Sequence, residues 1–299
     1  MLDPSAFEYD QQAPLDLRVL SERTQEGTIV QDITFASPRG SEVSAYVIFS
    51  SQPAPRAGVI FGHWGEGNRE EFVEEALVLA RLDVASLCLD APFRRPDASE
   101  PPLVEIPQDD VQAIVEVRRG VDVLTSRFEL PSEHLGYVGH SYGANLGAVL
   151  AGIEHRITAF VLMAGTYALS EYLQTTTHPV LVEERQKTPP EEYQAYLAAL
   201  APLDARHYLG HAAPSHLFFQ FARNDEFVPA TDGERSFALA SSPKQVACYE
   251  CQHAFNAQAR LDRALFLCEQ LGVARPSQEI LQLLEQVPSP IPLEEEASA

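Results

Sequence analysis

The chain has few basic residues for its size and no long apolar run. Its 299 residues include 21 Lys and Arg against 43 Asp and Glu, a formal net charge of −22. A surface of that sign repels phosphate backbones and anionic lipid heads, and its simplest role is to keep a protein in solution. No apolar stretch approaches the roughly 20 residues that span a bilayer. We therefore expect neither nucleic acid nor a membrane as a partner.

The amino terminus lacks a basic start followed by an apolar core, because Met1 to Asp16 is acidic and interrupted by two prolines. We expect no signal peptide.

The cysteines are also few, and they fit reduced thiols of the cytoplasm better than a disulfide framework. Cys248 and Cys251 form one Cys-x-x-Cys, but strand alternation would turn them to opposite faces and no second ligand pair follows. We expect no zinc site, no other metal and no organic cofactor. The four cysteines are Cys88, Cys248, Cys251 and Cys268.

The most informative segment that is present is Gly139-His140-Ser141-Tyr142-Gly143, which matches Gly-x-Ser-x-Gly where an apolar strand pattern changes to a helical one. Such a sharp turn exposes the hydroxyl of Ser141 and requires small residues on both sides. The helix N-terminus favours negative charge, and the Tyr142 N–H can face an oxyanion. A serine here can also simply cap the helix. Whether Ser141 is a nucleophile or a helix cap depends on whether the chain also supplies a base and an acid for it.

Two further residues follow predicted strands in the order that a serine nucleophile requires, which is serine, acid, histidine. Asp225 comes after the apolar strand Ser215 to Phe221, and His253 comes after the strand Gln245 to Glu250. The carboxyl ends of parallel strands meet at one edge of a sheet, so the three residues should lie together. Asp225 could instead only stabilise the turn in which it lies, and a lone histidine is often structural. Their joint order and position favour a catalytic triad.

A second oxyanion donor is expected from the loop His63-Trp64-Gly65, which follows the predicted strand Ala57 to Gly62. The amide could come from Gly65 or from Trp64, and we favour Gly65. The alternative is a plain glycine turn with the Trp64 ring in the core. A helical pattern from about Glu70 to Leu82 follows this loop.

Strand and helix patterns alternate along most of the chain, which predicts an α/β fold with a mostly parallel central sheet and helices on both faces. An antiparallel hairpin, 28–36 and 42–49, should lie at its edge. We expect an N-terminal extension at 1–27, a single domain at 28–271, and a C-terminal helix with an acidic tail at 272–299. The remaining predicted strands are 57–62, 84–90, 134–138, 157–163, 215–221 and 245–250, and a long helix is predicted at about 109–128.

Two irregular stretches should lie at the catalytic edge and shape a substrate pocket. In the first, 91–108, Arg94 or Arg95 could bind a substrate carboxylate or simply remain solvated. The second, 166–214, is too long for a turn, contains an amphipathic helix at 191–200, and is predicted to form a small cap. Tyr167 and Tyr172 in this cap could line the pocket or pack on the core. His63 is the remaining pocket candidate.

The His63 loop, the segment 139–143, Asp225 and His253 together resemble the α/β-hydrolase superfamily, in particular its dienelactone-hydrolase-like and prolyl-oligopeptidase-like esterase branch. The similarity covers about 28–271 and includes the segments 118–124 and 224–229. It implies an α/β-hydrolase fold and a serine hydrolase that cleaves a small-molecule carboxylic ester or thioester. Dienelactone hydrolases use a cysteine where this chain has Ser141, and no β-propeller sequence precedes the domain, so neither of those particular activities is expected.

Other functions on the same fold stay open at this stage. The protein could be a catalytically silent scaffold that binds a ligand or a protein partner, although all three triad residue types are present. It could also hydrolyse a carbon–carbon bond or act as a perhydrolase. The sequence gives no information on its oligomeric state or on the preferred acyl and alcohol groups.

Overall fold

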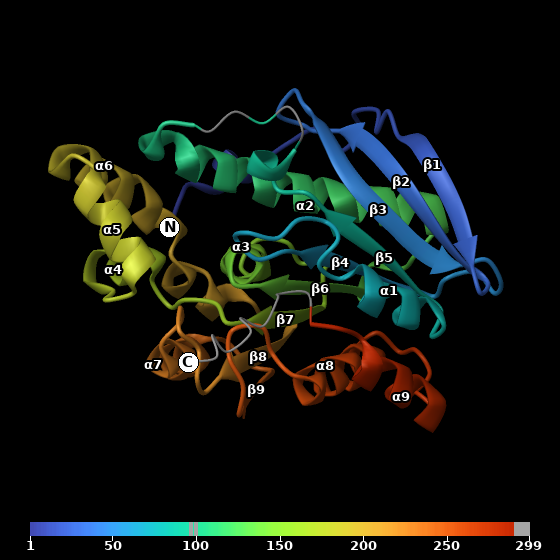
Figure 1. The fold of residues 1–299 in the computed structure, drawn as a ribbon. Coiled ribbons are helices and arrows are strands. Elements are labelled where there is room, and N and C mark those ends of the chain that lie inside the picture. The colour runs from blue at the N-terminus through green and yellow to red at the C-terminus, as the bar shows by residue number, and fades with distance from the viewer. Residues whose placement is uncertain (96–97, 99–100, 290–299) are drawn as a thin grey trace, which may run out of the picture.

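The computed structural model describes residues 1–95, 98 and 101–289, which fold around a mixed sheet (Figure 1). In this part of the chain the sheet contains nine strands in the order β1-β2-β3-β5-β4-β6-β7-β8-β9. The pairs from β1 to β5 along this order are antiparallel, and the others are parallel. The strands are β1 (Arg18–Gln25), β2 (Thr28–Ala36), β3 (Glu42–Ser50), β4 (Ala57–Gly62), β5 (Val84–Leu89), β6 (Leu135–His140), β7 (Ala159–Met163), β8 (His216–Ala222) and β9 (Lys244–Tyr249).

Helices cover both faces of the sheet, as the alternating pattern predicts. Ile60 on β4 packs in a core with α2 and α3, whereas its neighbours Val59 and Phe61 pack in a second core with α1 and α8. This alternation follows from the two-residue period of a strand. The predicted fold class is confirmed. The helices outside the cap are α1 (Val73–Ala80), α2 (Ile106–Phe128), α3 (Tyr142–Ala151), α7 (Ala230–Leu239), α8 (Ala257–Gln270) and α9 (Gln278–Gln286).

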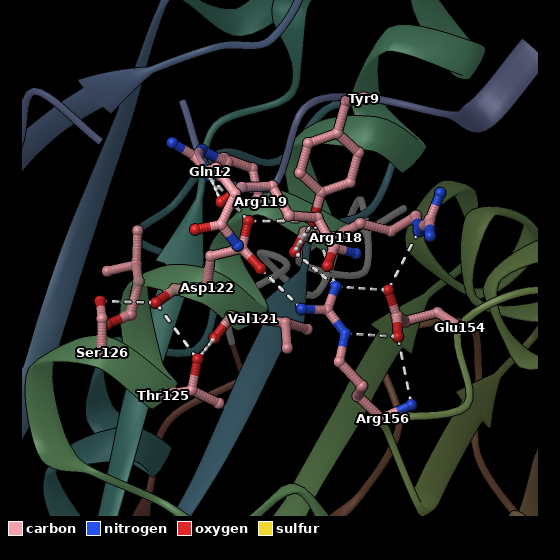
Figure 2. Close-up of polar contacts among 12 residues, drawn as sticks. Tyr9, Gln12, Arg118, Arg119, Val121, Asp122, Thr125, Ser126, Glu154 and Arg156 are labelled. Carbon is pink, nitrogen blue, oxygen red and sulfur yellow. Dashed lines mark hydrogen bonds and ion pairs between the residues drawn. The ribbon is translucent and has the colours of Figure 1, made fainter. Parts of the chain in front are cut away.

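The region predicted as an N-terminal extension includes an additional edge strand, β1, which pairs with β2. The residues before β1 are attached to α2 by polar contacts (Figure 2). Tyr9 donates a hydrogen bond to Asp122 over 3.0 Å, and Asp122 also pairs with Arg119 at 2.9 Å and Arg156 at 2.6 Å. The Arg118-Arg119 sequence that marked the family resemblance therefore has a structural role in this molecule.

Residues 166–214, which we call the cap segment, connect β7 to β8 and include three helices that lie together at one side of the molecule (Figure 1). Five apolar side chains give these helices a small core of their own. The predicted acidic tail (294–299) lies outside the described residues, as do 96–97 and 99–100 of the first irregular stretch. The cap helices are α4 (Leu169–Thr175), α5 (Pro179–Lys187) and α6 (Pro190–Leu200).

None of the helices in the described parts of the chain is both long and apolar enough to cross a membrane.

Candidate active site

Ser141 lies on the turn between β6 and α3. Its backbone angles, φ 52° and ψ −106°, are costly for a residue that has a side chain. The turn is tightly packed, because a Cβ on Gly139 would lie 2.3 Å from the Gly143 oxygen, and one on Gly143 would lie 2.2 Å from the Gly62 oxygen. Ser141 is the N-cap residue of α3, but its side chain makes no capping hydrogen bond. Helix capping therefore does not account for this serine.

Asp225 and His253 are in direct contact at the same edge of the sheet. Nδ1 of His253 lies 2.8 Å from Oδ2 and 3.0 Å from Oδ1 of Asp225. Asp225 Oδ1 also accepts hydrogen bonds from the amides of Phe227 and Val228, at 2.8 and 2.9 Å. A carboxylate on Nδ1 keeps a proton there and leaves Nε2 to accept another. The backbone amides thus hold the Asp225 carboxylate in place, and that carboxylate orients the His253 ring.

A second buried histidine–carboxylate pair lies against the first. Nδ1 of His140 is 2.7 Å from Oε1 of Glu71, and the side chains of the pair are 1% and 2% exposed. Nε2 of His140 lies 3.0 Å from the carbonyl oxygen of His253, and the two imidazole rings are 4.8 Å apart. Both ring nitrogens of His140 therefore lie within hydrogen-bonding distance of an oxygen atom. This pair holds the backbone of His253 beside the serine turn.

The same glutamate also fixes the loop after β4. The Trp64 amide donates a hydrogen bond to Oε2 of Glu71 over 2.7 Å. Trp64 was one of the predicted oxyanion donors, but its N–H is already used by this bond. No hydrogen bond to the Gly65 amide is found among the described residues, and Gly65 is exposed. The Tyr142 amide begins α3, where N–H groups have no intrahelical acceptor. Gly65 and Tyr142 are thus the free amides of the three predicted donors.

His63 is buried beneath this loop. Its Nδ1 lies 2.6 Å from the Trp64 carbonyl oxygen, and its Nε2 accepts a hydrogen bond from the Ala91 amide at 3.0 Å. These partners place the proton on Nδ1 of a neutral ring. Burial lowers the pKa of His63 and opposes a charge there. Both ring nitrogens are occupied, so His63 supports the loop.

The two arginines after β5 are also engaged by protein groups. Arg94 donates a hydrogen bond to the Gly65 carbonyl over 2.9 Å. Arg95 forms a buried ion pair with Glu116. Arg94 is exposed at the rim of the loop, whereas Arg95 has its charge compensated inside the protein.

The cap segment contacts the site from the side of Asp225. The His178 ring stacks on Phe227 with centroids 4.5 Å apart, and Phe227 lies 4.9 Å from the His253 ring. Burial raises the pKa of Tyr172, and the Asp225 carboxylate nearby adds to this effect. Tyr167 lies against the Arg235 guanidinium, 4.0 Å from its ring centre. The rings of Trp64, His140 and Phe227 surround His253, which is only 2% exposed.

The cysteines, Cys88, Cys248, Cys251 and Cys268, are free thiols. Across the described residues there is no group of three or more His, Cys, Asp or Glu side chains placed to hold a metal ion.

This sheet order, the serine turn and the acid–histidine pair define an α/β-hydrolase fold. Comparison of the sequence with protein-family models finds no match, and comparison with curated proteins finds none either. The evidence for the fold therefore comes from the structure itself and from similar solved structures.

Three solved structures illustrate this similarity. The acetyl xylan esterase from Paenibacillus sp. R4 aligns at a TM-score of 0.74 and 17% identity, covering 88% of this chain and 90% of that one. Acetyl xylan esterase 1 from Thermoanaerobacterium sp. JW/SL YS485 aligns at 0.74 and 13%, covering 89% and 91%. An S-formylglutathione hydrolase from Agrobacterium tumefaciens aligns at 0.63 and 14%, covering 85% and 100%. At these identities the comparisons establish the fold.

Proposed function

We propose that the protein is a serine hydrolase that cleaves a carboxylic ester through an acyl-enzyme on Ser141. The observation that carries this proposal is the Asp225–His253 pair beside a strained serine whose hydroxyl does not cap its helix. Strain of this kind is concentrated at functional sites because ordinary packing has no use for it. The names of the similar structures, which include two acetyl xylan esterases, point to the same class of reaction.

In the proposed reaction His253 takes the proton of the Ser141 hydroxyl as the oxygen attacks the ester carbonyl. Asp225 keeps Nδ1 protonated and stabilises the imidazolium that forms. The carbon–oxygen bond to the leaving group then breaks, and His253 gives the proton to the departing alkoxide. Water, deprotonated by His253 in turn, attacks the acyl-enzyme; the bond from the acyl carbon to the Ser141 oxygen then breaks, and His253 returns the proton to that oxygen as the acid is released.

The negative charge that develops on the carbonyl oxygen needs fixed donors. We assign this role to the amides of Tyr142 and Gly65. The Tyr142 amide lies at the positive end of α3, and the Trp64 amide is already bound to Glu71. Fixed backbone donors of this type stabilise a tetrahedral oxyanion without reorganising during the reaction.

We also infer a cytoplasmic location, because the four cysteines are free thiols and a reducing compartment keeps thiols in that state.

Labelling by a fluorophosphonate tests the nucleophile directly. The wild-type protein should be labelled at Ser141. The Ser141→Ala variant should not be labelled, and its kcat on short-chain esters should be lower by at least about 10⁴-fold. Circular dichroism and the melting temperature confirm that the variant is folded. A folded wild-type protein that is not labelled, with Ser141→Ala equal to it in ester hydrolysis, would contradict the proposal.

A further inference from the structure

A small cavity lies between α2, α3 and the cap segment, one helical turn from Ser141. Asn145 lines it, and the Asn145 amide donates a hydrogen bond to the Ser141 carbonyl over 3.0 Å. The free volume is about 30 Å³, which is room for a group of roughly the size of a water molecule. The lining residues that matter below are Asp110, Tyr142, Asn145, Thr166, Leu146 and Leu200.

Two polar groups at this cavity, the Tyr142 hydroxyl and the Asp110 carboxyl, make no hydrogen bond of ordinary geometry within the described residues. The Tyr142 hydroxyl is buried and has no hydrogen-bond partner in the part of the chain that the structure describes. The carboxyl of Asp110 is near enough to interact with this hydroxyl, but no hydrogen bond of ordinary geometry joins the two groups. Asp110 is 8% exposed, and no other hydrogen bond or ion pair to its carboxyl is found among the described residues. An arrangement of this kind is rare, because buried polar groups are nearly always paired.

The charges around the cavity indicate what kind of group would fit. Burial raises the pKa of Asp110 to about 7, the Tyr142 hydroxyl opposes this rise, and Asp109 adds to it. The other acid of the lining, Asp204, already accepts hydrogen bonds from Ser170 and is paired with Arg206. The lining contains no lysine or arginine. The lining therefore offers an anionic ligand acidic side chains and no cationic partner.

A hydroxyl group matches the two unpaired groups. It can donate to the Asp110 carboxylate and accept from the Tyr142 O–H, and it can also accept from Asp110 when that acid is protonated. An ammonium group has no acceptor and would leave the Tyr142 proton unpaired. The rest of the lining is mostly apolar, so an alkyl substrate would leave both polar groups buried and unpaired.

We propose that this cavity binds a hydroxyl group carried by the ester substrate, so that hydroxylated esters are preferred to their alkyl parents. The proposal rests on the hydrolase function inferred above. A site that hydrogen-bonds a substrate group discriminates strongly against the analogue that lacks it, because its own polar groups are then left unpaired.

The test compares kcat/KM for ethyl 3-hydroxybutanoate with ethyl butanoate, and for 2-hydroxyethyl butanoate with propyl butanoate. We expect wild-type protein to prefer the hydroxylated member of at least one pair by about tenfold or more. Asp110→Leu should abolish that preference, and Asp110→Asn, which keeps an acceptor, should retain part of it. Asp109→Asn is the matched control: Asp109 does not line the cavity and acts on Asp110 only through its charge. A hydroxyl can pair with either protonation state of Asp110, so this variant should change the ratio little.

Binding of the same esters to Ser141→Ala, measured by calorimetry, separates this proposal from the proposed function. The hydroxylated ester should bind more tightly than its parent even where no hydrolysis occurs, and Asp110→Leu should remove the difference. Hydrolysis of all four esters without preference, together with equal binding, would overturn the hydroxyl site and leave the hydrolase intact. A preference for the amino-substituted ester, ethyl 3-aminobutanoate, would overturn it as well.

Discussion

His140 stands at a variable position of the Gly-x-Ser-x-Gly motif, yet its imidazole connects three parts of the site. It contacts Glu71 on one side and the carbonyl of His253 on the other. Glu71 in turn holds the Trp64 amide. The loop of the proposed oxyanion donors and the proposed general base thus share one buried anchor. Glu71 and His140 would act through other residues, so they are positioning residues in the proposed reaction.

Glu71→Gln should lower kcat by about 10- to 100-fold with little change in KM, because the variant loses the carboxylate that holds His140 and small displacements of reacting groups are costly. Fluorophosphonate labelling should slow by a similar factor, since it uses the same serine and base. The measurement is steady-state kinetics with the melting temperature recorded in parallel.

Glu70→Gln is the matched control for this prediction. Glu70 is the exposed neighbour of Glu71 and faces solvent, so its replacement should leave kcat within about twofold. Equal kinetics for the two variants would show that the buried pair does not position the site.

At the scale of elements, a buried ion pair connects helices on one face of the sheet. Arg263 on α8 reaches Glu75 on α1, with Nε 2.8 Å from Oε1, and the side chains are 5% and 2% exposed. The two helices are far apart in sequence, so this contact determines how they pack. A buried pair is expensive to break, because removal of one partner leaves an uncompensated charge.

Arg263→Met should lower the free energy of unfolding by about 3–5 kcal/mol, measured by urea denaturation. The double variant Glu75→Leu with Arg263→Met should recover most of that loss, since no buried charge remains. Arg18→Met serves as the comparison, because the Arg18–Glu42 pair is more than half exposed, and it should cost under about 1 kcal/mol. A single variant as stable as the double would contradict the argument.

The sequence predicts elements well where they have a clear apolar signal. The six predicted strands of the central sheet and the long helix α2 occur within a few residues of their expected bounds. Strand β1 was not predicted because all eight of its residues are exposed and its pattern is polar. Helices α4 and α5 were missed for a related reason, since α5 buries none of its residues.

The sequence likewise predicts some residues of the candidate site and not others. Ser141, Asp225 and His253 could be proposed from motif and order, and the structure brings the acid and the histidine into contact. The Glu71–His140 pair could not, because it joins residues 69 positions apart. Nothing in the sequence distinguishes the buried Asp110 from its neighbour Asp109. Such pairings depend on how loops and helices meet in space.

For the molecule as a whole, Asp110 should make stability depend on pH. Its pKa is about 7 in the folded protein, raised by burial, against an ordinary value of 3.8. The folded state therefore holds a proton that the unfolded state has lost between these values. Its stabilising contribution is full below about pH 4 and disappears as the pH rises to about 7.

Asp110→Asn should remove this dependence. Urea unfolding at pH 5 and pH 7 should show the wild-type protein losing up to about 1.4 kcal/mol per pH unit more than the variant. Asp109 and the Tyr142 hydroxyl face the same carboxyl, and both stay in place in this variant. Parallel stability curves for the two proteins would contradict the raised pKa.

The contacts of residues 2–13 have a consequence for the order of folding. Tyr9 bonds to the Arg118 carbonyl, 109 positions later, and the Leu2 amide bonds to the Tyr208 hydroxyl, 206 positions later. These residues leave the ribosome long before their partners exist, and contacts so distant in sequence are slow to form. Residues 2–13 can therefore dock only after their partners on α2 and at Tyr208 have been synthesised.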